Sequence, residues 1–446
     1  MMNVAVMKTK FEQSLTEQFN HVSARLPGGA AVGVARKAAL GRFSALGLPN
    51  RRIEEWKYTD LRNALKEPLA VAVDDDTKVT VADLIVALGP LAHLEGPRIV
   101  FVNGGWRREL SNLEGAEGIE VAALGATLTA AQDKIGEALA GTTGPDNDAV
   151  LALNTAYMTD GAVVRVGDGV EVGKPLLLVF MRAGNEGRFV ATRNVVSIGK
   201  GAAATIVEAF IGLPGSTTEG QHNSATEIHV GDNARVTHVK IAADTGKATH
   251  LSNWMVGLGA EAVYRGFQLN QGLGLARNQI FATYHGEGAK LDLSGLFLGR
   301  GTEHIDTTLV VDHAVPRCES RELYKGVLDG EARGIFQGKV IVRPDAQKTD
   351  GKQMAQVLML SPDAEFDSKP ELEIYADDVV CGHGSTAAEL DTDLLFYLRA
   401  RGIPLDTARS MLIESFVGEA LDRIEHEGVR EVVLEFARGW LAKLGR

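Results

Sequence analysis

The amino-acid sequence predicts a mainly β protein, with a parallel β-helix (β-solenoid) as its core and helical regions at both ends. Three observations lead to this prediction: abundant glycine, apolar residues at alternate positions, and a repeat of about thirty residues. Fifty of the 446 residues are glycine, well above the usual share of roughly 7%. Many of them form corners between short alternating segments such as VVRVGDGVEV and TEIHVGDNARVTHVKI. Glycine supplies the positive φ angles of tight turns, so these segments are expected to be strands.

The small residue after each corner recurs with an imperfect period. The steps are 32, 32, 26, 29, 43 and 32 residues. A period in this range is typical of solenoids, in which each coil stacks on the last and buries its alternating face. A β-sandwich is the alternative that the pattern leaves open. The residues that define the steps are Val170, Ala202, Ala234, Ala260, Ala289, Ala332 and Ala364.

The two ends of the chain have helical patterns, which predicts three parts: a helical and mixed region over 1–150, the β-helix over 151–392, and a helical region over 393–446. The segment AVGVARKAALGRFSALGL is helical in spacing and ends at glycines and Pro49. Between residues 76 and 150, VADLIVAL and TLTAAQDKIGEAL predict helices, and RIVFVNGGW predicts a strand and a turn.

After Pro404 the sequence predicts two further helices, the first with Asp406 as N-cap and the second beyond Gly428. An apolar stripe on the first helix either caps the last coil or docks a partner. The stripe is formed by Ala408, Leu412, Phe416, Ala420 and Ile424.

Composition argues against several classes of partner. The formal net charge is −12, whereas nucleic acids and anionic membranes attract basic surfaces. No apolar run is long enough to span a membrane, and the N-terminal residues resemble neither a signal peptide nor a transit peptide. Two cysteines are too few for a disulfide framework, so we expect a cytoplasmic protein.

Most sequence signatures of catalysis and metal binding are absent. No P-loop, complete dinucleotide fingerprint or zinc motif occurs. Among the nearby histidines His222, His229 and His238, the first two differ by an odd number and are expected on opposite faces of one strand. Asp377 and Asp378 are adjacent, so they should not face one cleft together.

Cys381 and His383 are the strongest candidates for chemistry. They occur in DDVVCGHGST, and in a strand positions i and i+2 share a face. Thiolate and imidazole together form half of a metal or cluster site. The residues alone also permit a cysteine nucleophile with a histidine base, or a structural turn without chemistry.

Four segments together resemble the SufB/SufD family of iron–sulfur cluster assembly scaffolds, on its SufD side. They are EEWKYTDL, GVLDGEARGIFQGKVIVRPDAQKTDGKQ, KPELEIYADDVVCGHGST and DLLFYLRARGI. The resemblance covers the predicted solenoid, the first C-terminal helix and a short N-terminal motif, and 369–403 is its most specific part. It implies a right-handed parallel β-helix and a scaffold subunit without catalysis of its own.

The resemblance also implies partners and site residues. A SufB paralogue would pair with the β-helix, and a SufC ABC-type ATPase would bind the C-terminal helices, near Leu394, Phe396, Leu412 and Phe416. A nascent iron–sulfur cluster would be shared with SufB at His383, beside Cys381, with no cofactor in the isolated chain. A homodimer is expected when the chain is alone.

Some residues depart from the family's pattern, and two other classes of function stay open. Gly382, Ser385 and Ala388 differ from the residues common in the family, which affects the detailed geometry around the two candidate ligands. The alternatives to a scaffold are a stand-alone β-helix enzyme acting on carbohydrate and a metal hydrolase that uses Cys381 and His383. The resemblance assigns no role to Cys318, which is expected to be a buried thiol.

Overall fold

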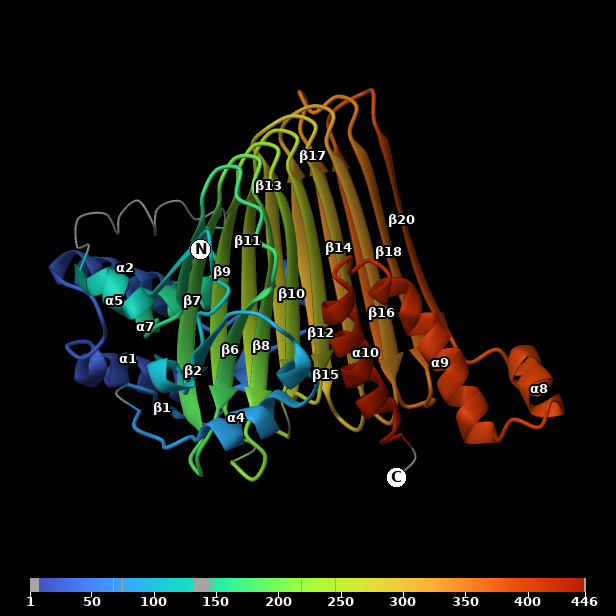
Figure 1. Ribbon diagram of the computed structural model, residues 1–446, viewed down its shortest axis with the longest axis horizontal. Helices are drawn as coiled ribbons and strands as arrows, with labels where there is room; N and C mark the ends of the chain where they lie inside the picture. The colour runs from blue at the N-terminus through green and yellow to red at the C-terminus, as the bar shows by residue number, and fades with distance from the viewer. Residues whose placement is uncertain are drawn as a thin grey trace, which may run out of the picture.

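Two facing sheets of parallel strands form the body of the protein (Figure 1). The computed structural model describes residues 8–444 except 67, 74, 131–144, 146, 218 and 245. Within these residues each sheet has ten strands, and strands β5 to β20 alternate strictly between the two sheets. All neighbours from β5 onward pair in parallel. The predicted parallel β-helix is therefore confirmed, and the β-sandwich alternative is wrong.

We name the sheets by the numbering of their parallel strands. The odd sheet contains β1 (Ala70–Val71), β4 (Ile119–Ala123), β5 (Ala162–Val166), β7 (Arg188–Ile198), β9 (Gln221–Val230), β11 (Thr249–Leu258), β13 (Leu275–Tyr284), β15 (His304–His313), β17 (Arg333–Val342) and β19 (Glu365–Ile374). The even sheet contains β2 (Arg98–Val102), β3 (Gly105–Trp106), β6 (Leu176–Arg182), β8 (Ala203–Gly212), β10 (Arg235–Ala243), β12 (Val263–Gln271), β14 (Lys290–Gly299), β16 (Glu319–Leu328), β18 (Asp350–Met359) and β20 (Val380–Ala388).

The corner before each even strand from β6 to β18 contains one residue with a positive φ, followed by a small residue. The positive-φ residues are Gly169, Gly201, Asn233, Glu261, Gly288, Arg317 and Lys348. We call the space between the two sheets the lumen. After six of these seven corners, the small residue faces the lumen and is buried. These six are Ala202, Ala234, Ala262, Ala289, Cys318 and Thr349. The prediction that Cys318 is a buried thiol is thus confirmed, since it belongs to this column.

The predicted period was right, but three of its markers were assigned to the wrong place. Ala262, not Ala260, aligns with Ala234, because Val263 pairs with Arg235. Ala332 and Ala364 precede the odd strands β17 and β19, so they lie at the opposite corner of the coil. The two corners have similar turn residues, which is why the sequence alone did not separate them.

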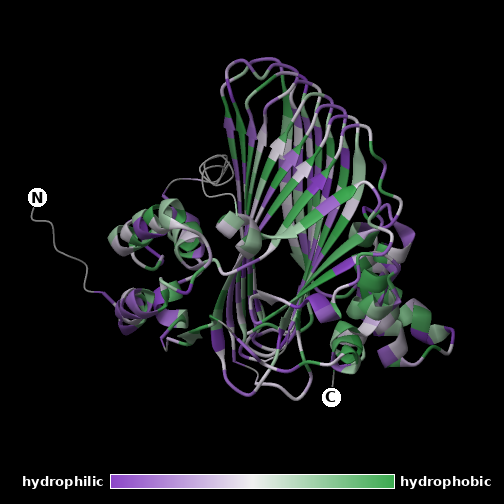
Figure 2. Ribbon diagram, turned by 60° about the vertical axis from the view of Figure 1, so that its left-hand side comes forward, coloured by the Kyte–Doolittle hydropathy of each residue, from purple (hydrophilic) through white to green (hydrophobic). Residues whose placement is uncertain are grey.

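Apolar residues pack both inside and outside the β-helix, and hydrophobic and hydrophilic residues alternate along many strands (Figure 2). The lumen is filled by one continuous core that includes Trp254, Tyr264 and Phe297. The outer face of the odd sheet is covered by the N-terminal helices, and that of the even sheet by α4, α9 and α10. The β-helix is therefore a middle layer between two helical coats.

Most of the helices lie where the sequence patterns predicted them. Gly47, with a φ of 70°, is the C-cap of α2, and Asp148 caps α7. The helix expected over 127–139 is described only as far as Ala130, and the rest lies outside the described residues. The helical elements of the N-terminal region are α1 (Lys10–Val22), α2 (Ala30–Leu46), η1 (Glu54–Trp56), α3 (Leu61–Ala64), α4 (Val81–Leu88), η2 (Gly89–His93), η3 (Arg108–Leu110), α5 (Leu124–Ala130) and α7 (Ala149–Tyr157).

The C-terminal region contains α8 (Thr392–Ala400), α9 (Leu405–Leu421) and α10 (Glu427–Leu441). Asp406 is not the N-cap of α9; that position is Pro404, whose backbone begins the helix without a side-chain hydrogen bond. Gly428 lies inside α10, which begins one residue earlier behind the N-cap His426. The boundaries expected at residues 150 and 392 stay predictions. No helix among the described residues is long and apolar enough to cross a bilayer.

Candidate functional site

Cys381 and His383 lie in β20, the last strand of the even sheet, and not in a turn. Neither Gly382 nor Gly384 has a positive φ, and the whole segment pairs with β18 in register. The glycines that suggested a turn are therefore extended, because the backbone continues the sheet across them. The interpretation of this segment as a structural turn was wrong.

Both candidate side chains face the lumen at the open end of the β-helix. Cys381 pairs with Gly351 and His383 pairs with Gln353. Gly351 and Gln353 face inward on β18, on either side of the outward-facing Lys352. The inward row continues into the core at Ala355. No further coil covers β20 among the described residues, so His383 is exposed and Cys381 is half-buried.

The Cys381 thiol is not activated within this chain. Burial raises its pKa, the nearby acidic groups Asp350 and Glu322 raise it further, and a backbone hydrogen bond from Gly351 opposes them. A raised thiol pKa keeps the sulfur protonated at neutral pH and so a weak nucleophile. No hydrogen bond joins Cys381 to His383. The geometry therefore does not favour a hydrolase with a cysteine–histidine pair.

The lumen beneath this strand is lined by polar groups. Glu322 lies below Gln353, which itself lies below His383. Glu322 is 2% exposed, and neither of its carboxyl oxygens has a hydrogen-bond partner of normal geometry within the described part of the chain. Burial raises its pKa to about 8, so this acid is mostly protonated at neutral pH. Ser320, beneath Gly351, forms a 3.1 Å hydrogen bond with His313.

The described residues do not complete a metal centre here. No group of three or more His, Cys, Asp or Glu side chains among them has the arrangement to hold a metal ion. Cys381 and His383 can therefore supply two donors, one sulfur and one nitrogen, while any further donors must come from outside the described chain. Such a mixed donor set suits iron–sulfur clusters as well as borderline metals.

The residues expected to dock an ATPase differ in their surroundings. Leu394 and Phe396 on α8 are 51% and 73% exposed, and α8 buries no residue of its own. In Figure 1 it projects from the end of the molecule that carries β20. Leu412 and Phe416 on α9 are half-buried, and the Lys325 ammonium lies 4.2 Å from the centre of the Phe416 ring. The most buried residues of α9 are Ala408, Ile413, Val417, Ala420 and Leu421.

The N-terminal motif EEWKYTDL anchors its region to the odd sheet. Trp56 is buried, and the Arg277 guanidinium lies 4.3 Å from its ring centre. Arg277 forms a buried ion pair with Asp306, and Asp306 also accepts a hydrogen bond from the Thr59 hydroxyl. Removing one partner of a buried ion pair is strongly destabilising. These contacts give the motif a structural explanation.

Sequence reasoning missed a second pair of histidines. His222 lies beside His250 of the next coil, as direct neighbours in the parallel strands β9 and β11. The candidates His229 and His238 do not join them: His229 faces the other side of β9, and His238 is in the even sheet. Residues one repeat apart lie side by side in a solenoid, so a search at the repeat spacing would have found this pair.

The fold and this site define a class of protein: a parallel β-helix that presents ligand-type side chains on an uncovered end, beside a projecting helix. The family model described as "SUF system FeS cluster assembly, SufBD core domain" matches residues 180–416. The model described as "SufBD protein N-terminal region" matches residues 9–178. The chain thus belongs to the SufB/SufD family of the SUF system for iron–sulfur cluster assembly.

Relatives match over most of the chain. The iron–sulfur cluster assembly SufBD family protein slr0076 of Synechocystis is 33% identical over 398 residues, covering 87% of this chain and 86% of the relative. Iron-sulfur cluster assembly protein SufD of Escherichia coli is 29% identical over 393 residues, covering 87% and 88%. SufD of Bacillus subtilis is 27% identical over 299 residues, covering 64% and 65%. The resemblance found in the sequence is confirmed.

Proposed function

We propose that this chain is a SufD-type scaffold subunit on which, together with a SufB paralogue, a nascent iron–sulfur cluster is built and then passed on. The cluster is cargo and not a resident cofactor. ATP hydrolysis is the work of a SufC ABC-type ATPase partner, and the chain itself catalyses no reaction. The cytoplasm is the proposed location, and the isolated chain is proposed to pair with itself.

The observation that carries this proposal is the uncovered end of the β-helix. Strands β19 and β20 have no outer neighbour among the described residues, so both present unpaired backbone groups and inward side chains. Three large apolar residues there are strongly exposed: Ile374, Tyr375 and Val380 at 42%, 62% and 61%. Exposed apolar edges of this kind are typical of surfaces that pair with another chain.

The same end explains why the candidate ligands form only half a site. A SufB paralogue that continued the two sheets would add its own strand beside β20, and its side chains would then lie next to His383 and Cys381. Donors from two subunits would hold the cluster, which could be released when the interface opens. The ligand role of His383 fits its exposure among the residues that the structure describes.

Helix α8 is the proposed contact for the ATPase. Its residues Leu394 and Phe396 are 51% and 73% exposed, so burying them against a partner would remove apolar area from water. Leu394 and Phe396 are the central residues of this surface, with Leu412 at its border. Phe416 contributes indirectly, because its ring packs against Lys325 and helps hold α9 on the even sheet.

The ligand role is tested by His383→Ala in the chain co-purified with its SufB and SufC partners. We expect the complex to assemble normally, while anaerobic cluster formation and transfer to an apo-protein fall strongly. Ser385→Ala is the matched control, since Ser385 is the next lumen-facing residue of β20. Wild-type cluster formation by the His383 variant in an intact complex would disprove the ligand role.

The docking surface is tested by replacing both Leu394 and Phe396 with alanine. Both side chains are at least half exposed, so the free energy of unfolding should change by less than about 0.5 kcal/mol. ATPase binding should weaken by about 2 kcal/mol or more, which is roughly 30-fold in Kd. Unchanged ATPase affinity would show that the partner binds elsewhere. Deleting everything after Pro404 is a poorer test, because α9 and α10 cover the even sheet.

A further inference from the structure

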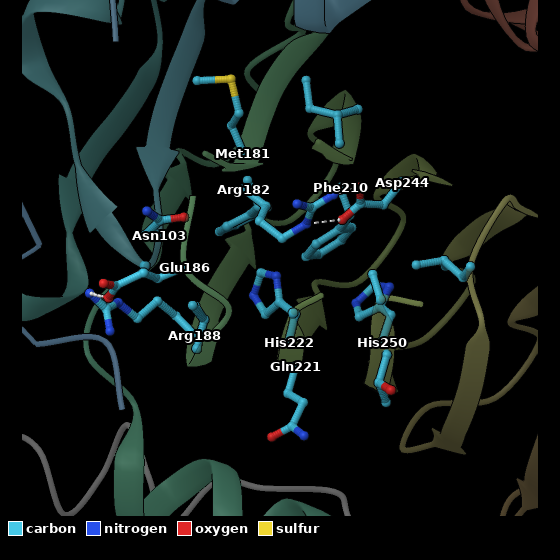
Figure 3. Close-up of a pocket in the computed structure, with 18 residues that line it drawn as sticks. Asn103, Met181, Arg182, Glu186, Arg188, Phe210, Gln221, His222, Asp244 and His250 are labelled. Atoms are coloured by element: carbon cyan, nitrogen blue, oxygen red, sulfur yellow. Dashed lines mark hydrogen bonds and ion pairs between the residues drawn. The ribbon is translucent and has the colours of Figure 1, made fainter. Parts of the chain in front are cut away.

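A cavity lies in the N-terminal coils of the β-helix, away from the end that carries Cys381. It opens at the corner where even strands end and odd strands begin, and its enclosed space is about 40 Å³. Figure 3 shows His222 and His250 side by side, with Phe210 above them in this view, and all three line the cavity. The ion pairs Arg182–Asp244 and Arg188–Glu186 also line it.

The two imidazoles are held in place by an arrangement that repeats from one coil to the next. His222 Nε2 lies 2.8 Å from the Thr192 hydroxyl, and His250 Nε2 lies 2.9 Å from the Ser224 hydroxyl. Each hydroxyl comes from the preceding odd strand, two residues further along. The ring centres are 5.5 Å apart and the rings are tilted by 40°. Hydrogen bonds of this kind orient histidines in metal sites and fix which nitrogen is free.

One nitrogen of this pair has no partner. His250 is 2% exposed and lines the cavity, yet its Nδ1 forms no hydrogen bond with any residue that the structure describes. Buried polar atoms are nearly always satisfied, so an unpaired one at a cavity points to a missing water, ion or ligand. Imidazole binds metal ions in its neutral form, so a free ring nitrogen at a cavity is a candidate ligand.

The size and charge of the cavity restrict the ligand. A space of about 40 Å³ holds two or three water-sized groups, and not a nucleotide or a sugar. The donors are two neutral imidazoles, and no third His, Cys, Asp or Glu of the described chain completes a cluster with them. Asp244 is already held by Arg182 through contacts of 2.9 and 2.5 Å. The buried Glu208 carboxylate acts electrostatically on His222 and the buried Lys240 ammonium on His250. These two nearby charges offset each other, so a doubly charged ion would gain little net compensation, which is costly.

We propose that His222 and His250 bind one monovalent copper ion, Cu⁺, inside the β-helix. Imidazole is a suitable ligand for copper, and Cu⁺ is satisfied by two nitrogen donors without additional anions. Its single charge suits a neutral donor set better than Zn²⁺ or Fe²⁺. This site is separate from His383 and does not depend on the proposed role in cluster assembly.

A Cu⁺ titration tests the proposal, and it begins with a variant that lacks other side chains able to bind Cu⁺. Cys318 and Cys381 are changed to alanine, together with His383→Ala. Alanine suits position 318, because Ala262 and Ala289 occupy the same place in neighbouring coils. The full-length variant is titrated with Cu⁺ under anaerobic, reducing conditions against a chromophoric Cu⁺ chelator. We expect one ion per chain, and X-ray absorption should show two imidazole nitrogens.

Four further variants and one competing metal decide the outcome. His222→Gln or His250→Gln in this background should weaken Cu⁺ binding by about 100-fold, and Thr192→Val by about tenfold through loss of orientation. His229→Gln, on the outer side of the same strand, should have no effect. Equal Cu⁺ affinity before and after the histidine changes would overturn the proposal, as would fewer than two imidazole ligands in the absorption spectrum. If Zn²⁺ displaced Cu⁺ mole for mole, the charge argument would be wrong.

Discussion

Replacing Glu322 by glutamine should stabilise the folded protein at neutral pH. The side chain lies in the lumen on β16, pairs across the sheet with Gln353, and is fully enclosed. Burial is the main cause that raises its pKa, from 4.5 to about 8, and the nearby charge of Arg321 offsets only part of the effect. Glutamine has a similar shape to the protonated acid and cannot ionise.

The size of the effect follows from linkage between protonation and folding. Because the folded pKa is raised, the unfolded carboxyl ionises first as pH increases, and this favours unfolding. The penalty is absent below the unfolded pKa of 4.5 and grows until the folded pKa of about 8. Each pH unit in this window costs about 1.4 kcal/mol. The penalty is therefore about 3 kcal/mol at pH 7, and Glu322→Gln should remove it.

Denaturant unfolding measured at several pH values between about 5 and 8 tests this linkage. The variant should gain little at the acidic end of the series and about 3 kcal/mol at pH 7. Glu319→Gln is the matched control on the same strand: its partly exposed carboxylate pairs with Lys290 at 3.1 Å, and we expect a change below about 0.5 kcal/mol. A gain for Glu322→Gln that does not vary with pH would show that this carboxyl is not held neutral, and the reasoning would fail.

Two further predictions concern packing and helix capping. Gly326→Ala should lower the free energy of unfolding by about 1–3 kcal/mol or more, because the added Cβ would lie 2.1 Å from Phe297 Cε2. Gly382→Ala is the control, since a Cβ there meets nothing within 4 Å and should leave the stability unchanged. Equal melting temperatures for the two variants would contradict the lumen packing described above. His426→Ala should destabilise the protein by about 1 kcal/mol, because His426 Nδ1 accepts the Val429 N–H at 3.2 Å as N-cap of α10. His426→Asn should restore most of that loss in denaturant unfolding, and no difference between the two substitutions would exclude a capping role.

The β-helix was predictable because its two signals are local. Alternation of apolar residues depends on neighbours two positions apart, and the repeat depends only on spacing along the chain. The assignment of corners failed where turn chemistry is ambiguous: Glu261, Arg317 and Lys348 adopt positive φ without being glycine. Asp406 failed as an N-cap for a different reason, since Pro404 already fixes the start of α9 two residues earlier.

The candidate site was predictable in part. The shared face of Cys381 and His383 follows from strand periodicity alone, and the structure places both in the lumen-facing row. Their exposure did not follow, because it depends on β20 being the last strand of its sheet, and no local pattern marks a final coil. The His222–His250 pair was missed because its two members are neighbours only after the chain has completed a coil.

The two ends of the β-helix are built differently, and this difference connects the pairing proposal to the ligand proposal. At the N-terminal end each sheet finishes with an antiparallel strand, β4 beside β5 and β3 beside β2. At the C-terminal end, the terminal strands β19 and β20 have no outer neighbour among the described residues. A partner strand that continued the even sheet would lie about 4.8 Å from β20, with one residue directly opposite His383. A partner held only by helices would not bring a donor to that distance. If His383 shares a cluster with another subunit, the β-helices must therefore meet end to end, and a change that blocks this contact must also abolish the role of His383.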